Sequence, residues 1–327
     1  MKAIFCTQYG SPDVLRLKEV EKPAPKDDEV LVRIHAASAN PLDWHLMRGS
    51  PFLARLGGGL RRPKDPRLGV DIAGRVEAVG NNVTRFQPGN EVFGTVKGGF
   101  AEYACAREDR LALKPANISF EEAAAAPVVA FTALQGLRDK GKIRPGQKVL
   151  VNGASGGVGT FAVQMAKSFG TEVTGVCGTR NVDMVRSIGA NYVVDYTQED
   201  FTKNGQRYDL ICDAVGNRSV SDYKRALRPQ GTCIIIGFTT LSRLFGHVVL
   251  GPLLSMTGNK KIGLMGVAKP NQKDLVLVKE LLEAGKVVPV IDRRYPLGET
   301  ADAIRYLEEG HARGKVVITV DLNDGHG

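Results

Sequence analysis

Short apolar runs bounded by turn residues fill the first hundred residues, and they predict β-strands rather than helices. The expected strands are residues 30–36, 72–79, 91–95 and 101–106. The tetrapeptide Gln87-Pro88-Gly89-Asn90 predicts a turn before the third of them. Between residues 40 and 69 the periodicity is lost, which predicts a flexible loop. This part of the chain is therefore expected to be an all-β module.

From about residue 115 the pattern changes to apolar strands separated by amphipathic helices. Ser119 followed by Glu122 has the spacing of a capping box, which predicts the start of an alanine-rich helix. Strands are expected at 148–152, 172–177, 192–195, 210–213, 232–236 and 261–267, with helices at 157–169, 182–188 and 220–227. Such apolar strands predict a parallel six-stranded sheet covered on both faces. The tail, with helices at 274–284 and 299–309 and a strand at 315–320, is expected to return to the first module.

A glycine-rich turn directly follows the first strand of this sheet and opens the next helix. In the segment KVLVNGASGGVG the spacing is Ala154-x-Gly156-x-x-Gly159, with alanine in place of the usual first glycine. Glycines let the backbone turn sharply, let a pyrophosphate approach without a Cβ in the way, and let the helix pack closely on the strand. The phosphates then meet unpaired amides at the helix N-terminus. This strand-turn-helix context predicts a dinucleotide-binding site at residues 153–159.

The end of the following strand distinguishes NAD from NADP. An NAD-selective site has an Asp or Glu about 20 residues beyond the turn, where the carboxylate accepts the ribose hydroxyls. This chain has no carboxylate from Val176 to Asn181. Thr179 and Arg180 would instead bind a 2′-phosphate with charge-assisted hydrogen bonds, so NADPH is the predicted cofactor. The alternative for Arg180 is a solvated residue in the first turn of the next helix.

Composition and charge narrow the class of protein. The 327 residues are 43% hydrophobic and 24% charged, which is ordinary for a globular protein long enough for two domains. The net charge of +9 suits any polyanion, but the basic residues are scattered without interleaved aromatic residues, so nucleic-acid binding is not expected. The five cysteines form no CxxC pair, which fits reduced thiols in the cytoplasm. Neither apolar stretch, 123–134 or 234–256, is expected to span a membrane, because one is short and the other contains charges.

The glycine turn and the capping-box helix occur in order with five further segments: NPLDWHLMRG, GVDIAGRVEAVG, PGNEVFG, GGFAEYA and GKVVITV. Together they resemble the medium-chain dehydrogenase/reductase superfamily, and within it the zinc-independent, quinone oxidoreductase-like branch. The resemblance implies a GroES-like β-barrel catalytic domain at residues 1–122, an α/β Rossmann NADP-binding domain at 123–268, and a return to the catalytic domain at 269–327. It also implies a homodimer formed through the edge of the Rossmann sheet.

The resemblance assigns most of the cofactor contacts. Those expected along the pyrophosphate are Ala154, Ser155, Gly156, Gly157, Val158 and Gly159. Those expected at the 2′-phosphate and the adenosine are Thr179, Arg180, Tyr196 and Val215. Those expected beside the nicotinamide are Thr132, Gly237 and Phe238, with Lys315 reaching the cofactor from the barrel.

The zinc ligands of the zinc-bearing alcohol dehydrogenases are replaced in this chain. Asn40 stands in place of a Cys, Val70-Asp71 in place of a His-Glu pair, and Val128 in place of a Cys or Asp. Because Asn and Val are poor zinc ligands, no metal is expected. Without zinc to stabilise an alkoxide, hydride transfer from NADPH to a quinone, enone or other conjugated carbonyl is favoured over oxidation of simple alcohols.

Such a reduction needs a hydrogen-bond donor at the developing oxygen anion and a proton source, which can be solvent. Three residues are candidates. Asn40 would orient or polarise the substrate, and Asp43 would hold the loop or bind ribose. His45 is the third, although a structural role is the stronger alternative for a lone His.

Other functions remain open at this point. An enoyl-thioester reductase is one, but relatives often carry a Tyr near His45 and this chain has none between Asn40 and Gly69. Non-catalytic binding of NADPH or nucleic acid is another, and a zinc enzyme with unconventional ligands is a third.

Overall fold

The computed structural model of the chain describes residues 1–50, 52, 55–240, 242–248 and 259–320. The predicted apolar stretch 234–256 therefore lies partly outside the described residues. The chain divides into two compact units. The first consists of Met1–Val128, Pro270–Ala284 and Pro289–Gly327, and the second of Val129–Lys269 and Gly285–Val288. Over the residues described, no helix has the length and apolar character needed to cross a membrane.

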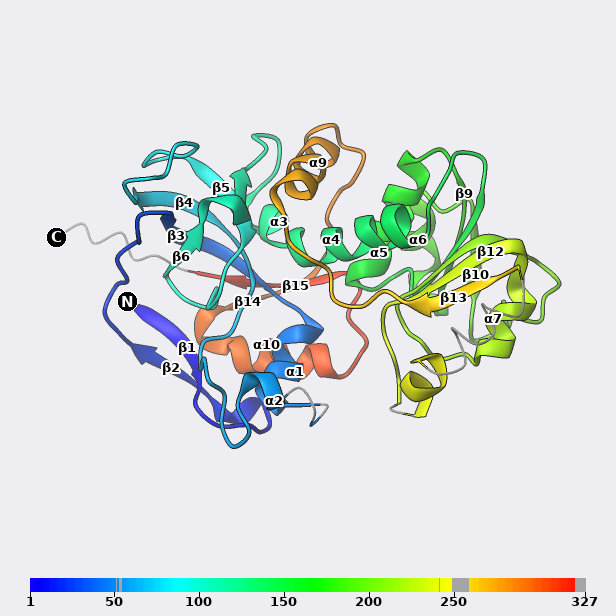
Figure 1. Cartoon of the computed structure of the whole chain (residues 1–327), viewed down its shortest axis with the longest axis horizontal. Coiled ribbons are helices and arrows are strands. Elements are labelled where there is room, and N and C mark those ends of the chain that lie inside the picture. The colour runs from blue at the N-terminus through cyan, green and yellow to red at the C-terminus, as the bar shows by residue number, and fades with distance from the viewer. Residues whose placement is uncertain (51, 53–54, 241, 249–258, 321–327) are drawn as a thin grey trace. The chain divides into compact units, whose positions relative to one another are not determined.

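The first unit consists mainly of strands. Seven form one sheet in the order β14-β15-β3-β4-β5-β7, with β6 paired to β3, while β1 and β2 form a separate pair (Figure 1). The strands are Lys2–Cys6 (β1), Leu15–Glu19 (β2), Glu29–Ala39 (β3), Asp71–Val79 (β4), Glu91–Thr95 (β5), Tyr103–Arg107 (β6), Leu111–Leu113 (β7), Ile291–Pro296 (β14) and Lys315–Thr319 (β15). The helices are Pro41–Arg48 (α1), Arg55–Gly58 (α2), Phe120–Ala124 (α3), Gln272–Glu283 (α9) and Thr300–Glu308 (α10).

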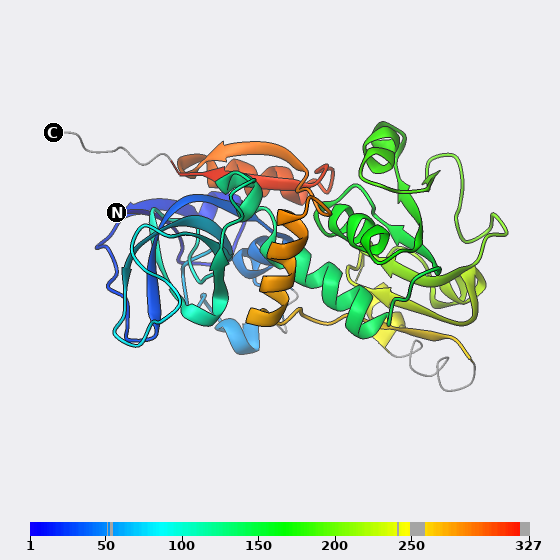
Figure 2. The same cartoon turned by 90° about the horizontal axis from the view of Figure 1, so that it is seen from above.

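Most of the C-terminal tail belongs to the first unit. Strand β15 pairs antiparallel with β3, and β14 pairs parallel with β15, so that the orange and red strands lie side by side in Figure 2. Ile34 of β3, Ile72 of β4 and Ile318 of β15 share one buried core cluster with Ile304 of α10. The C-terminal segment therefore completes the core of the first unit.

The loop predicted between residues 40 and 69 is wrong over its first part, because α1 occupies residues 41–48. Asn40 precedes this helix, Pro41 is its first residue, and Gly49 ends it with a left-handed φ of 59°. Proline at the first position and glycine after the last are local helix signals that the missing hydrophobic periodicity obscured. The first module is consequently not all-β.

The second unit begins within α4 (Pro127–Gln135) and contains a sheet with the predicted six parallel strands, in the order β10-β9-β8-β11-β12-β13 (Figure 1). The strands are Lys148–Asn152 (β8), Glu172–Cys177 (β9), Tyr192–Asp195 (β10), Tyr208–Asp213 (β11), Leu227–Ile235 (β12) and Lys261–Leu264 (β13). The helices are Gly157–Ser168 (α5), Val182–Ser187 (α6) and Val220–Ala226 (α7).

Both faces of this sheet are covered, which explains its continuous apolar strands. A Cβ on Gly175 of β9 would lie 2.5 Å from Val185 Cγ1, so α6 packs directly on that face. The next residue, Val176, points to the opposite face and shares a core cluster with Tyr223 of α7. The carboxyl ends of β8 and β9 are followed by the turns that lead into α5 and α6.

Several further predictions need correction. The strands β1, β2, β7 and β14 were not expected, because β1, β2 and β14 contain charged residues and β7 is only three residues long. The alanine-rich helix is divided at Pro127 into α3 and α4, since proline cannot continue an α-helix from the preceding turn. Its start is confirmed, because Ser119 Oγ accepts from the Glu122 amide at 3.2 Å.

Candidate functional site

The glycine turn joins β8 to α5 in the second unit. Gly153 has a left-handed φ of 79°, and its amide and that of Ala154 both donate to Val176 O, at 3.1 and 3.0 Å. A Cβ on Gly159 would lie 1.9 Å from Gly153 O, so helix and turn pack too closely for any side chain there. Gly153 and Gly159 are thus required by the fold itself.

Gly156 is different, because the fold does not require it. It has a φ of −85°, open to any residue, and the nearest atom to a Cβ at this position would be Gly153 O at 3.5 Å. Its missing side chain leaves the backbone accessible at the N-terminus of a 12-residue helix, where unpaired amides attract anions. The turn therefore fits the pyrophosphate of a dinucleotide.

The segment expected around the adenosine lies against this turn, and the segment expected beside the nicotinamide lies against the adenosine segment. A Cβ on Gly153 would lie 2.7 Å from Val215 Cγ2, and one on Gly216 would lie 2.1 Å from Gly237 O. The buried carboxylate of Asp213 fixes the backbone that follows β11, because its Oδ1 accepts hydrogen bonds from the amides of Val215 and Gly216 at 2.8 and 2.7 Å.

Two further groups bind the same carboxylate. Tyr223 donates to Asp213 Oδ2 at 2.6 Å, and Asn152 Nδ2 lies 3.1 Å from both carboxylate oxygens. Asn152 ends β8, immediately before the glycine turn, so Asp213 links the carboxyl ends of β8 and β11. Asp213 was not expected, because backbone amides leave no sequence signal and Asn152 lies 61 residues away.

The residues expected at the 2′-phosphate lie together at the ends of β9 and β10. The hydroxyl of Tyr196 lies over Gly178, 3.0 Å from where a Cβ would be, and Arg180, two residues after Gly178, is exposed. Thr179 Oγ1 donates to Asp195 Oδ2 at 2.6 Å, and this hydrogen bond lowers the pKa of Asp195. Sequence analysis missed Asp195, which lies 16 residues after Thr179 and reaches it because β10 pairs with β9.

A second set of polar residues converges in the first unit, where the last residues of β3 lie beside the first residues of β4 and β15. Ser38 of β3 is opposite Asp71 of β4, and Val316 of β15 is opposite Ala39. This register brings Asn40 and Lys315 to one place although they are 275 residues apart. All of these side chains are buried, with Lys315 only 2% exposed.

The cluster is internally hydrogen-bonded. Lys315 Nζ donates to Asn40 Oδ1 at 2.6 Å and to Ala39 O at 3.1 Å, and lies 3.6 Å from Asp71 Oδ2. Three acceptors around one nitrogen match the three protons of an ammonium group. Asn40 Nδ2 in turn donates to Asp71 Oδ2 at 2.9 Å and to Ser38 O at 3.3 Å. The orientation of the Asn40 amide is therefore fixed from both ends.

Comparisons with known proteins identify the family of the chain. Family models described as "Alcohol dehydrogenase GroES-like domain" and "Zinc-binding dehydrogenase" match residues 26–116 and 188–318. A chloroplastic quinone-oxidoreductase homolog from Spinacia oleracea is 34% identical, with 97% of this chain and 98% of the relative covered. The chain belongs to the medium-chain dehydrogenase/reductase family, in its quinone oxidoreductase-like branch.

Two other relatives extend this result. The NADPH-dependent alkenal/one oxidoreductase of Arabidopsis thaliana is 33% identical over 97% of this chain and 79% of its own length. The solved structure of the quinone oxidoreductase from Coxiella burnetii superimposes with a TM-score of 0.84 at 30% identity, covering 98% of this chain and 99% of the other. The predicted fold, a Rossmann domain with a GroES-like domain, is confirmed.

Two of the three candidate catalytic residues of this dehydrogenase/reductase lie next to each other. Asp43 Oδ2 accepts a hydrogen bond from the backbone N–H of Asn40 at 2.8 Å, and Asp43 Oδ1 accepts one from the backbone N–H of Gly69 at 3.1 Å. Asp43 thereby joins the two ends of segment 40–69. The His45 ring instead contacts Ser50 O at 2.9 Å through Nδ1 and stacks on Trp44, and burial lowers its pKa.

We predict that Asp43 makes the stability of the first unit depend on pH. Burial raises the pKa of Asp43 to about 7, against the lowering effect of the hydrogen bond from Asn40. Because the folded state holds this proton more tightly, the contribution to stability is complete below the unfolded pKa of about 4 and is lost as the pH rises through the folded pKa. The free energy of unfolding should fall by about 2 kcal/mol from pH 5 to pH 7.

Urea unfolding followed by fluorescence measures this effect, since Trp44, the single tryptophan, lies beside Asp43 in α1. In Asp43→Asn the fall in the free energy of unfolding between pH 5 and pH 7 should be smaller than in the parent by about 2 kcal/mol, whatever the absolute loss of stability. An identical slope in both proteins would contradict the prediction.

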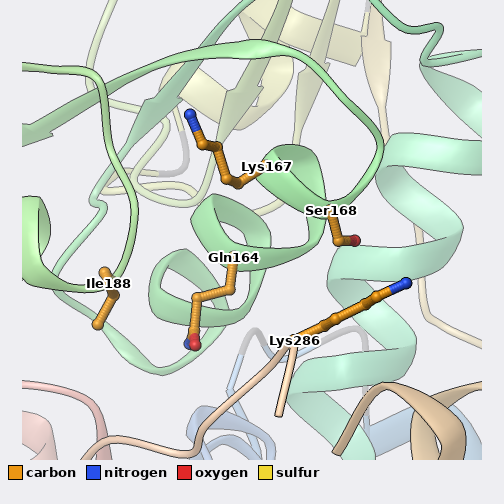
Figure 3. Close-up of a pocket in the computed structure, with 5 residues that line it drawn as sticks. All are labelled: Gln164, Lys167, Ser168, Ile188 and Lys286. Atoms are coloured by element: carbon orange, nitrogen blue, oxygen red, sulfur yellow. The ribbon is translucent and has the colours of Figure 1, made fainter. Parts of the chain in front are cut away.

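A pocket on the second unit lies at the far end of α5 from the glycine turn. It has a volume of about 220 Å³ and is lined by Gln164, Lys167, Ser168, Ile188 and Lys286. The ammonium groups of Lys167 and Lys286 point away from each other (Figure 3), and Lys167 Nζ donates to Asn191 Oδ1 at 3.1 Å. The pocket therefore lacks the convergent charges of an anion site. In the part of the chain that the structure describes, no group of three or more His, Cys, Asp or Glu residues is arranged to hold a metal ion.

Proposed function

We propose that this chain is an NADPH-dependent oxidoreductase that reduces quinones, enones or related conjugated carbonyls by hydride transfer without zinc. The observation that carries the proposal is the glycine at position 156 of the turn. The fold has room for a side chain there, so the glycine is explained by the approach of a bound pyrophosphate. The names of the relatives, quinone oxidoreductase and NADPH-dependent alkenal/one oxidoreductase, support the class of acceptor.

The residues proposed to hold the dinucleotide form three groups. The pyrophosphate group is Ala154, Ser155, Gly156, Gly157, Val158 and Gly159. The adenosine group is Thr179, Arg180, Tyr196 and Val215. The nicotinamide group is Thr132, Gly237 and Phe238, with Lys315 from the first unit. Bound NADPH supplies the hydride, and the amides of the first turn of α5 stabilise its phosphates.

The polar cluster of the first unit is proposed to position the substrate side of the reaction. Both amide protons of Asn40 are donated to Asp71 and Ser38, and the protons of Lys315 are similarly engaged. This supports an orienting role for Asn40, with solvent as the proton source for the product. Asp43 holds segment 40–69 in place, and His45 remains a proposed participant at the outer side of α1.

The test is oxidation of NADPH by the purified protein with a panel of quinones and enones. Turnover is expected with several conjugated acceptors and should persist after dialysis against EDTA. Crotonyl thioesters belong in the panel, because preferred turnover of a thioester would point to an enoyl-thioester reductase. Binding of NADPH without turnover of any acceptor would overturn the proposed activity.

Arg180 gives a separate prediction about the cofactor. Arg180→Ala should weaken NADPH binding by about ten-fold, through loss of a charge-assisted hydrogen bond to the 2′-phosphate, and change NADH binding little. Titration of each dinucleotide measures the effect. Arg186→Ala, on α6, is the control, since Arg186 pairs with Asp183 at 3.8 Å. Equal losses for both dinucleotides would show that Arg180 does not contact the phosphate.

We also propose that the protein is a cytoplasmic homodimer. Strand β13 is the last described strand in the order of the parallel sheet, and the proposed contact between the two copies is at this end of the sheet. All five cysteines are free thiols, which suits a reducing compartment. Light scattering should give twice the mass of the chain, and cell fractionation tests the compartment. A monomer in solution or recovery from another compartment would contradict these assignments.

A further inference from the structure

The corner formed by Thr179, Asp195 and Thr197 has more hydrogen-bond contacts than hydroxyl protons. Thr179 Oγ1 lies 2.6 Å from Asp195 Oδ2, and Thr197 Oγ1 lies 2.8 Å from Asp195 Oδ1. The two hydroxyl oxygens are also 3.1 Å apart. Two protons must therefore serve three contacts.

The carboxylate takes both protons. Hydrogen bonds to an ionised acceptor are shorter and stronger than those between neutral groups, and here the two contacts with Asp195 are the short ones. The Thr197 amide at 2.9 Å and Gln198 Nε2 at 3.3 Å also donate to Asp195, so the carboxylate is well satisfied. Thr179 is left with lone pairs and no proton to offer.

This arrangement suits a 2′-hydroxyl better than a 2′-phosphate. A ribose hydroxyl can donate to the lone pairs of Thr179, whereas a phosphate dianion offers only acceptors and is repelled by a nearby carboxylate. Asp195 is aligned with Cys177 in the β9–β10 register, which is the strand end where NAD-selective sites carry their acid. The neighbouring strand thus supplies the carboxylate that β9 lacks.

We propose that Asp195 is a specificity-determining residue that lowers the preference of this chain for a 2′-phosphorylated dinucleotide over its 2′-hydroxyl counterpart. The proposal rests on the dinucleotide site proposed above. Arg180 attracts the phosphate and Asp195 opposes it, and specificity is the difference between the two effects. Thr179, expected from the sequence to donate to the phosphate, does so only when Asp195 no longer takes its proton.

The experiment is direct titration of NADPH and NADH at about 0.15 M salt, where distant charges are screened. Asp195→Asn should raise the ratio of the NADH to the NADPH dissociation constant by about three- to ten-fold, chiefly through tighter NADPH binding. Asp183→Asn is the matched control, because it removes a fully exposed carboxylate, 102% exposed, on neighbouring α6. The control should change the ratio by less than about two-fold.

A double-mutant cycle with Thr179→Val tests the proton count itself. Alone, Thr179→Val should change NADPH affinity by less than about two-fold, whereas in the Asp195→Asn background it should cost several-fold, because the hydroxyl is free to donate there. Far-UV circular dichroism confirms that each variant is folded.

The outcomes separate this inference from the proposed function. An unchanged ratio in Asp195→Asn, or a large loss of NADPH affinity in Thr179→Val alone, would overturn the role of Asp195. If the unmodified protein binds neither dinucleotide, the proposed function fails and this inference fails with it.

Discussion

Gly159→Ala is expected to lower the stability of the second unit by about 3 kcal/mol, the upper end of overpacking penalties, and to weaken NADPH binding by about 100-fold. A Cβ at this position would lie 1.9 Å from Gly153 O and 2.8 Å from Ala154 Cα, both backbone atoms. These atoms cannot move aside unless the turn opens or α5 shifts. Either change displaces the amides that face the pyrophosphate.

Gly156→Ala is the matched variant in the same turn. Its Cβ would meet no atom closer than 3.5 Å, so the unbound protein should unfold at nearly the temperature of the parent. NADPH affinity should nevertheless fall by about ten-fold, because the methyl group occupies space that the pyrophosphate needs. Thermal unfolding without ligand and titration with NADPH measure the two effects separately. A Gly159→Ala protein as stable as the parent, or full NADPH affinity in Gly156→Ala, would contradict this account.

Lys315→Met is expected to destabilise the first unit by about 3–5 kcal/mol at neutral pH, because it leaves a buried carboxylate without its cation. Burial raises the pKa of Asp71 and lowers that of Lys315, and the attraction between them opposes both shifts. Without the ammonium group the pKa of Asp71 should rise further. The loss of stability should therefore be largest at high pH and shrink as the pH falls and Asp71 is protonated.

Turnover should also fall in Lys315→Met, since Asn40 loses the donor that fixes its amide oxygen. Lys114→Met is the control, because Lys114 has a side chain only 5% exposed and binds Pro115 O and Ile118 O outside the cluster. It should lose stability without a comparable loss of kcat. Adding Asp71→Asn to Lys315→Met should restore part of the stability by removing the unpaired charge. Trp44 fluorescence follows unfolding, and unchanged kcat in folded Lys315→Met would contradict the positioning role.

Local patterns explain what the sequence predicted well. Strands β8, β9 and β10 begin and end where expected, because their short β-branched and apolar runs stop at glycine and polar residues. The glycine turn was recognisable for the same reason, since its strand, its glycines and its helix are contiguous. Helix α1 was not expected although Pro41 and Gly49 mark its ends, because its residues show no clear hydrophobic periodicity.

The side-chain contacts that the sequence did not predict are made between residues that are distant in the sequence. Asp195 reaches Thr179 only because β10 pairs with β9, and Lys315 reaches Asn40 only through the register of β15 on β3. A sequence pattern names such residues as polar but does not say which atoms they meet. Thr179 was accordingly expected to donate to a phosphate, whereas the structure commits its proton to Asp195.

The unequal demands on Gly153, Gly156 and Gly159 separate two kinds of evolutionary constraint. A related protein that has lost the enzymatic activity must keep Gly153 and Gly159 to remain folded, but it can accept a side chain at position 156. Retention of glycine at 156 across related genomes would then mark copies that still hold a dinucleotide, and substitution there with the other two intact would mark folded copies that have lost it.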